Sequence, residues 1–169
     1  MSIQTRLAER EGFPMRVAWT TCIALTLIAT AATAEPATVK IDQITDSTAR
    51  AASHMFRFEP DLVRLQPGET VTFLNSRGEH TVHSVGELWP AGVPSVSISN
   101  QPSVVVRFDV AGVYGFRCAR HGRYGMVMLV VVGKPPTQSA ADTALAGLRI
   151  DRRERAAFER LLSAAIGTP

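Results

Sequence analysis

The order of apolar and polar positions divides the chain into three regions. In residues 37–133, short apolar segments alternate with polar positions or are rich in β-branched residues, and turn residues such as Pro67-Gly68 and Gly112 separate them. The clearest segments are 38–41, 71–74, 104–108, 113–116 and 126–132. Short strands separated by turns every ~8–12 residues predict a mainly β fold, a Greek-key β-sandwich. Residues 86–102, with Pro90, Gly92, Pro94 and several serines, are expected to form mainly a loop.

After Lys134-Pro135-Pro136 the apolar spacing changes to that of helices. One short helix is expected around residues 140–148, and a second begins at Asp151 and Glu154, a pair that resembles a capping box. The apolar stripe of the second helix is Phe158, Leu161, Leu162 and Ala165, and arginines with intervening acids form its solvated face. We expect residues 134–169 to form a pair of α-helices packed on the sandwich, rather than a membrane or partner helix.

Residues 1–34 have the layout of a secretory signal peptide. Arg6, Arg10 and Arg16 precede an uncharged apolar run from 17 to 31, and Ala32-Thr33-Ala34 forms a small-x-small cleavage site. Met15 is an alternative start, and an uncleaved anchor is disfavoured because the run is short and rich in threonine. The expected domains are therefore a signal peptide at 1–34, a sandwich at 35–133 and a helical extension at 134–169.

Composition limits the chemistry that this chain can perform. A formal charge of +3 is too small to indicate a nucleic-acid binder, although the pI is about 9.3. Two cysteines and four histidines exclude a zinc ribbon with two Cys pairs, and they are too few for a copper enzyme with several centres. Outside the expected signal peptide the chain holds one cysteine, Cys118, which has no internal disulfide partner in an exported protein.

Cys118 begins a motif with metal-ligand spacing. Histidine follows at +3 (His121) and methionine at +8 (Met126), and either His80 or His83 could supply a second imidazole. A thiolate, two imidazoles and a weak thioether are the ligands of a blue copper electron-transfer site. Each residue alone has a structural alternative, such as a core role for Met126 in its apolar strand. Their conjunction in an exported β-sandwich favours the copper site.

These residues identify the chain as similar to the cupredoxins, and among them to the pseudoazurins. The matching segments include Phe58-Glu59-Pro60, residues 67–73, His80-x-Val82, Gly112-Val113-Tyr114 and Cys-x2-His-x4-Met, together with the helical tail. The resemblance implies that one type 1 copper is held by His80, Cys118, His121 and Met126. His121 would be the ligand nearest to solvent, through which electrons leave. The resemblance also favours His80 over His83, and it leaves His83 and His54 as surface residues.

The chain departs from that family pattern around the expected copper. Thr81 and Ala119 stand where hydrogen-bonding side chains usually tie the two ligand loops together, so the tie is either missing or rebuilt. Arg120 stands where proline is usual before the second histidine, and it restores a backbone N–H near the cysteine. Groups next to the ligands tune a metal site strongly. These departures affect the expected potential and not the expected ligands.

The resemblance implies a periplasmic one-electron carrier that is not an enzyme and that cycles between Cu(II) and Cu(I). Arg117, Arg120 and Arg123 surround the ligand loop without an acid among them, and they predict a docking face for an acidic partner. Implied partners are a c-type cytochrome, a copper nitrite reductase or another denitrification enzyme. We expect a monomer with no membrane span after signal cleavage. The alternative is a copper-binding or copper-delivery module without electron transfer, and a copper enzyme is disfavoured because only His54 and His83 remain as ligands.

Overall fold

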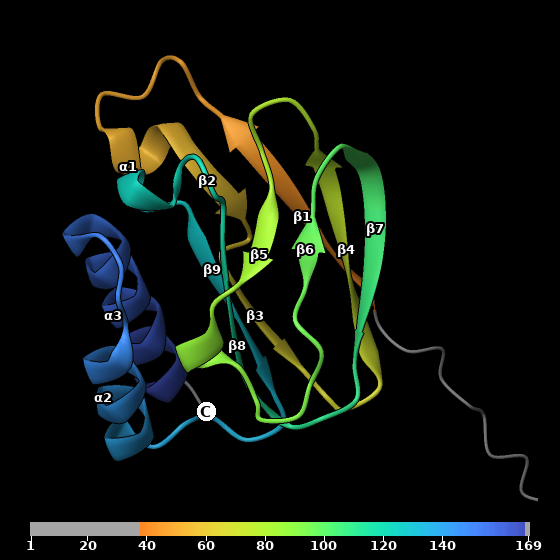
Figure 1. Cartoon of the computed structure of the whole chain (residues 1–169), viewed down its shortest axis with the longest axis vertical. Coiled ribbons are helices and arrows are strands. Elements are labelled where there is room, and N and C mark those ends of the chain that lie inside the picture. Colours follow the sequence, from red (N-terminus) through yellow and green to blue (C-terminus); the bar gives the residue numbers. More distant parts are fainter. Residues whose placement is uncertain (1–37, 168–169) are drawn as a thin grey trace, which may run out of the picture. The chain divides into compact units, whose positions relative to one another are not determined.

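The computed structural model describes residues 38–167, so the expected signal peptide lies outside the described residues. Nine strands form two sheets (Figure 1). In sheet order, the first consists of β2 (Phe56–Glu59), β1 (Thr38–Thr45), β4 (Glu69–Ser76) and β7 (Gln101–Phe108). The second consists of β3 (Leu62–Leu65), β9 (Val127–Val132), β8 (Gly112–Arg117), β5 (Val82–Ser84) and β6 (Ser97–Ile98). The predicted mainly β sandwich is confirmed.

Strand pairing joins segments that are distant in sequence. β1 runs parallel to β4, with Ile41 opposite Phe73, and β3 runs parallel to β9, with Leu65 opposite Val132. The remaining pairs are antiparallel, and the longest register, between β4 and β7, extends from Glu69–Phe108 to Ser76–Gln101. The chain crosses between the sheets several times: His80 lies between β4 of the first sheet and β5 of the second, whereas Cys118, His121 and Met126 lie between β8 and β9 of the second.

The position of β9 explains why the sequence segment 126–132 is continuously apolar. All six residues of β9 are buried. Met128, Val130 and Val132 point into the core between the sheets, whereas Val127 and Leu129 belong to a second cluster under the helices. Successive side chains of a strand point to opposite faces, so a strand covered on both sides has no polar position.

Two helices cover the outer face of the second sheet (Figure 1). α2 (Gln138–Gly147) begins at Thr137, whose hydroxyl accepts a hydrogen bond from the Ala140 amide, and α3 (Arg152–Gly167) follows. The apolar stripe expected on the second helix, Phe158, Leu161, Leu162 and Ala165, is buried. The Arg155 guanidinium donates to the carbonyls of Leu145 and Leu148 and links the two helices. Neither helix is long and apolar enough to cross a bilayer, nor is any other among the described residues.

Three shorter helical turns complete the fold. They are α1 (Ala52–Met55), η1 (Gly86–Leu88) and η2 (Gly122–Tyr124). η2 lies between β8 and β9, inside the Cys-x2-His-x4-Met segment, and α1 leads directly into β2. η1 and β6 lie within the segment expected to be mainly a loop.

Candidate metal centre

Three side chains with metal-ligating atoms meet at one end of the sandwich. The ligating atoms of His80, Cys118 and His121 lie within 4.8 Å of one another. The side chains are buried, with 7% of His80, none of Cys118 and 7% of His121 exposed. His80 precedes β5, and the other two residues follow β8, so the antiparallel pairing of β5 with β8 brings the two ligand segments together.

Backbone hydrogen bonds close the segment from Cys118 to Met126 into a compact turn, here called the ligand loop. The Cys118 amide donates to the Met126 carbonyl at 3.1 Å, and the Met126 amide donates to the His121 carbonyl at 3.2 Å. Gly125 ends η2 with a φ of 98°, a left-handed conformation that favours glycine. Met126 is fully buried in the core beside Cys118. Both of these hydrogen bonds join residues within the loop, so the loop that contains the Cys-x2-His-x4-Met spacing is closed by its own backbone.

The His80 imidazole has one occupied and one open nitrogen. Its Nε2 lies 2.9 Å from the hydroxyl of Thr45, the last residue of β1. Its Nδ1 is buried and has no hydrogen-bond partner. A buried nitrogen without a partner is costly unless it binds something. Because a neutral imidazole nitrogen is a common ligand of copper, the open Nδ1 beside a thiol and a second imidazole fits a copper ion.

His121 is held by an aromatic ring instead of a hydroxyl group. Phe56 stacks on its imidazole with the ring centroids 3.8 Å apart and an interplanar angle of 2°. Burial and the charges of His80, Arg120 and Arg123 lower the pKa of His121, against the opposing charge of Glu79. His121 is exposed to the same 7% as His80, so the exposed fraction does not distinguish it as the ligand nearest to solvent. The covering Phe56 ring accounts for this.

Cys118 lies among groups that favour its thiolate. Burial alone raises the pKa of the thiol, but the His80 side chain and the backbone amides of His121, Thr81 and Arg120 outweigh it and lower the pKa to about 7. The thiolate is the form that binds metals. The position of the Arg120 amide agrees with the N–H expected there from the absence of proline.

The tie between the two ligand segments is rebuilt by Thr81. Its hydroxyl oxygen accepts a hydrogen bond from the Ala119 amide at 2.9 Å and lies 3.8 Å from the Cys118 sulfur. One hydroxyl from the His80 side therefore contacts both the sulfur and the adjacent backbone. The link between the two ligand segments, which the sequence left as either missing or rebuilt, is therefore present in another form.

The other two histidines lie outside the cluster. The Nδ1 atom of His83 is 3.2 Å from the Ser97 hydroxyl on the neighbouring strand β6. His54 is exposed in α1. Among residues 38–167 there is a single group of three or more His, Cys, Asp or Glu side chains with ligating atoms this close together.

Behind the ligand loop lies a buried ion pair that the sequence did not predict. Arg117 Nε is 2.9 Å from Oε1 of Glu154, and the Glu154 side chain is 1% exposed. A β-carbon placed on Gly122 would come within 2.9 Å of the same Glu154 oxygen, so α3 packs directly against the residue after His121. Glu154 therefore supports the ligand loop and does not complete the expected capping box. Asp151 alone caps α3, by accepting from the Arg153 amide at 2.8 Å.

The charges around the loop differ from those expected on two counts. Arg117 is committed to Glu154, which leaves Arg120 and Arg123 as the exposed arginines of the loop. An acid is also present, because the Glu79 carboxylate lies 3.9 Å from Nε2 of both His80 and His121. The Thr45 hydroxyl donates to Glu79 at 2.6 Å and is the main reason that the pKa of Glu79 is lowered. Glu79 precedes His80 in the sequence, but its proximity to His121 arises only in the fold.

Comparison with known proteins decides the family. Residues 45–133 match the family described as copper binding proteins, plastocyanin/azurin family. The chain belongs to this family. As a cupredoxin, it is a copper-binding protein, and the His80, Cys118 and His121 cluster lies within the matched residues. The predicted cupredoxin family and the predicted copper cofactor are confirmed.

Relatives support the same placement within the cupredoxins. The pseudoazurin of Methylorubrum extorquens is 46% identical over 79 residues, which span 47% of this cupredoxin and 53% of that protein. The chloroplastic plastocyanin of Tetradesmus obliquus is 34% identical over 125 residues, or 69% of this chain and 81% of that one. The alignments with the pseudoazurin relatives span about half to three fifths of their length. A solved pseudoazurin from Methylobacterium extorquens AM1 superposes with a TM-score of 0.62 at 30% identity, covering 76% of this chain and 98% of that one.

Proposed function

We propose that His80, Cys118, His121 and Met126 hold one type 1 copper ion. The observation that carries this proposal is the buried cluster of two imidazoles and a thiol in which Nδ1 of His80 has no partner within the protein. The soft sulfur of Cys118 and the neutral imidazoles accept both oxidation states of copper. Met126, buried beside Cys118, is the thioether of the set.

We infer that the protein is a one-electron carrier and not an enzyme. Copper bound by these ligands supplies reversible exchange of one electron between its Cu(I) and Cu(II) states. The metal-ligating side chains are fixed in advance by three kinds of contact: hydrogen bonds within the ligand loop, the Thr81 hydrogen bond and the Phe56 stack. A fixed set of donors needs little rearrangement when an electron is gained or lost. The remaining histidines, His54 and His83, lie outside the cluster and do not build a second centre for catalysis.

The proposed location and partners rest on the signal-like leader and on the relatives. The signal-like residues 1–34 and the pseudoazurin relatives favour the periplasm. The partners that we propose are redox proteins such as a c-type cytochrome and a copper nitrite reductase or other denitrification enzyme. The protein would work as a monomer, without nucleic acid and without a membrane span after signal cleavage.

A copper-delivery module is the alternative function, and the burial of the ligands argues against it. A carrier that hands over its metal benefits from exposed donors, whereas here the three clustered side chains are at most 7% exposed. Stopped-flow mixing of the Cu(I) protein with an inorganic oxidant, followed by re-reduction with ascorbate, tests the choice. Repeated cycles with copper retained through gel filtration support electron transfer. Loss of copper to a Cu(I) chelator as fast as oxidation itself would favour delivery.

A further inference from the structure

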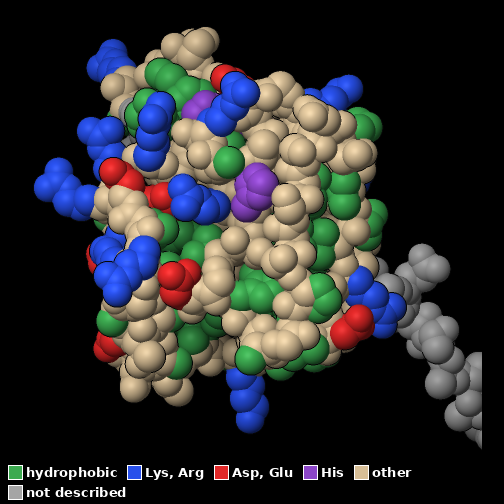
Figure 2. All heavy atoms as spheres, viewed as in Figure 1, with side chains coloured by type: hydrophobic (Ala, Val, Ile, Leu, Met, Phe, Trp, Pro, Cys, Tyr) green, Lys and Arg blue, Asp and Glu red, His purple; other side chains and the backbone are tan. Residues whose placement is uncertain are grey.

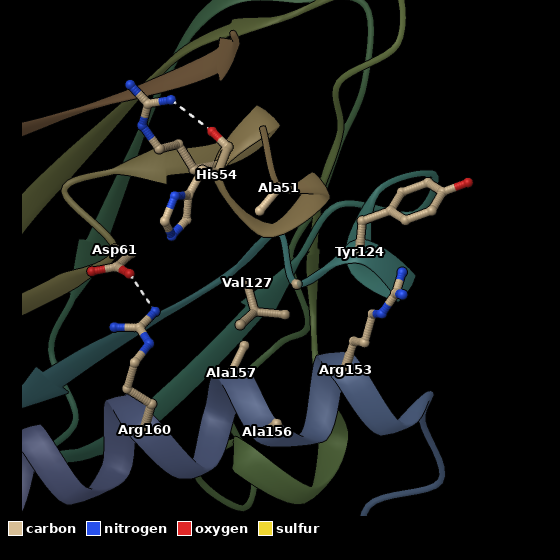
Figure 3. Close-up of a pocket in the computed structure, with 11 residues that line it drawn as sticks. Ala51, His54, Asp61, Tyr124, Val127, Arg153, Ala156, Ala157 and Arg160 are labelled. Carbon is tan, nitrogen blue, oxygen red and sulfur yellow. Dashed lines mark hydrogen bonds and ion pairs between the residues drawn. The ribbon is translucent and has the colours of Figure 1, made fainter. Parts of the chain in front are cut away.

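A groove of 870 Å³ lies beside the ligand loop (Figure 3). One wall is the ligand loop at Tyr124, the second is α3 with Arg153 and Arg160, and the third is formed by α1 and β2, where His54 and Arg57 lie. Figure 3 shows His54 pointing into the cavity and Arg153 extending from α3 toward the turn that carries Tyr124. The groove is distinct from the hollow of 630 Å³ above His121, which Met55, Phe56 and Arg120 help to line.

The lining of the groove combines basic side chains with small or apolar ones. Four of its residues are His or Arg, whereas Asp61 is its single acid. Between the charged residues the surface is formed by Val127, Ala156 and Ala157. Figure 2 shows Lys and Arg side chains gathered on the side of the molecule where η2 and the start of α3 lie.

The positive charge is unbalanced at the end of the groove nearest the ligand loop. Arg160 is paired with Asp61 at 2.7 Å, and Arg57 is paired with Glu59 at 3.1 Å. Within the described residues, neither Arg153 nor Arg123 has a carboxylate within 4 Å. The Arg123 guanidinium lies 4.9 Å from the centre of the Tyr124 ring, just outside the groove. An adjoining hollow is lined by Tyr124, by three arginines and by one acid, so positive charge is in excess there (Arg123, Arg152, Arg153 and Asp151).

Tyr124 connects the groove to the metal centre. Its ring centroid is 5.9 Å from that of Phe56, and Phe56 stacks on His121 at 3.8 Å. A polypeptide in the groove would contact a ring that is two aromatic contacts away from a copper ligand. Occupation of the groove therefore brings a partner close to the centre without uncovering His121.

We propose that this groove docks an acidic segment of the redox partner. The inference rests on the proposed electron-transfer function and adds the place and the chemistry of docking. Arg153 in the groove and Arg123 beside it select carboxylates, and the small or apolar residues of the lining accept small side chains between the charged groups. A volume of 870 Å³ holds several side chains, which favours a peptide segment over a single small anion.

Titration of the ¹⁵N-labelled Cu(I) protein with a hexaglutamate peptide, followed by NMR, tests the proposal. We expect saturable shifts of amides in residues 54–57, 124–127 and 153–160, with smaller shifts at higher salt. Arg153→Glu should weaken peptide binding roughly tenfold, as expected for reversing one charge of a desolvated contact. The matched control is Arg149→Glu, which makes the same charge change at an exposed residue between the helices and should leave the affinity unchanged.

Besides an absence of peptide binding, three results would overturn the proposal. The first is shifts confined to Ala119 and Arg120, which would place docking over His121. The second is equal weakening by Arg153→Glu and Arg149→Glu, which would indicate attraction by net charge alone. The third is equal shifts with free glutamate at the same carboxylate concentration, which would indicate a small-anion site. The visible spectrum of the oxidised samples separates the two proposals: loss of the blue band overturns the copper function, whereas a retained band without peptide binding overturns only the groove.

Discussion

His80 and His121 present equally exposed imidazoles to the same centre, but the protein holds them by different means. His80 is fixed by a hydrogen bond from its Nε2 to the Thr45 hydroxyl, and it lies against the first sheet. His121 is fixed by the face of Phe56 and lies in a loop that α3 supports from behind through Glu154. A hydrogen bond fixes which nitrogen faces the metal, whereas a ring stack fixes only the plane of the imidazole. The loop that carries His121 must therefore be held rigid by its own backbone and by α3.

The largest expected effect comes from removing either imidazole. His80→Ala and His121→Ala should each abolish the intense blue absorption of the copper-loaded protein, because each removes one nitrogen donor of the set. His83→Ala is the matched control, since His83 bonds to Ser97 outside the cluster and its loss should leave the spectrum intact. A blue protein after His80→Ala, or a colourless one after His83→Ala, would contradict the assignment.

The second largest effect should come from removing Glu154, which supports the ligand loop from behind. Glu154→Ala leaves Arg117 without its buried partner, and we expect a loss of about 3 kcal/mol in the free energy of unfolding, the lower end for a broken buried pair. The lower end applies because Arg117 keeps a third of its side chain exposed. Urea unfolding monitored by circular dichroism gives the value.

The second ion pair of α3 provides the control for that variant. Arg160 pairs with Asp61 at 2.7 Å, but both side chains are exposed, so Arg160→Ala should cost about 0–1 kcal/mol. We also expect faster release of Cu(I) to a chelator from Glu154→Ala and not from Arg160→Ala. Equal effects of the two variants would show that α3 stabilises the fold without supporting the loop.

Phe56→Leu should loosen His121 while leaving His80 in place. Ring pairs contribute about 0.5–1.5 kcal/mol beyond the area that they bury, so we expect roughly fivefold faster release of Cu(I) to a chelator. Phe56→Tyr keeps the stacked ring and should behave like the wild type. An unchanged rate for the leucine variant would mean that the stack does not hold the imidazole.

Thr45→Val should have the smallest effect, and it acts on His80. The exchange removes the hydroxyl that contacts Nε2 of His80 and Oε1 of Glu79, and a hydrogen bond of this kind contributes about 1 kcal/mol. We expect a two- to fivefold faster release of Cu(I), about the size of that energy. Thr45→Ser, which keeps the hydroxyl, should restore the wild-type rate.

The sequence predicted the features that depend on local pattern. Long strands such as β4, β7 and β9 follow from alternation or apolar runs, and α3 follows from its stripe of four apolar residues. The short strands β5 and β6 have three and two residues, which is too few for a period to be recognised. The sequence could predict that Cys118, His121 and Met126 lie close together, because a single loop contains all three.

Contacts between distant segments could not be predicted in the same way. Phe56 on His121 and Glu154 on Arg117 join residues 65 and 37 positions apart, and nothing local distinguishes either from an ordinary core or helix residue. By sequence, Glu154 was compatible with a capping box. Only its burial shows that it supports the ligand loop instead. The Thr81 contact was similarly open, because a hydroxyl can restore a tie only if the Ala119 amide faces it.

The visible spectrum of the Cu(II)-loaded protein, compared with that of Cys118→Ser, tests the central claim most directly. A thiolate bonded to Cu(II) in a type 1 site gives an intense band at about 600 nm, and serine cannot replace it because a hydroxyl is a hard, weakly donating group. The wild type should show this band, and Cys118→Ser should lose it while keeping the circular dichroism of the folded sandwich. A colourless wild type that binds Cu(II), or a serine variant that keeps the band, would contradict the assignment of Cys118 as the copper thiolate.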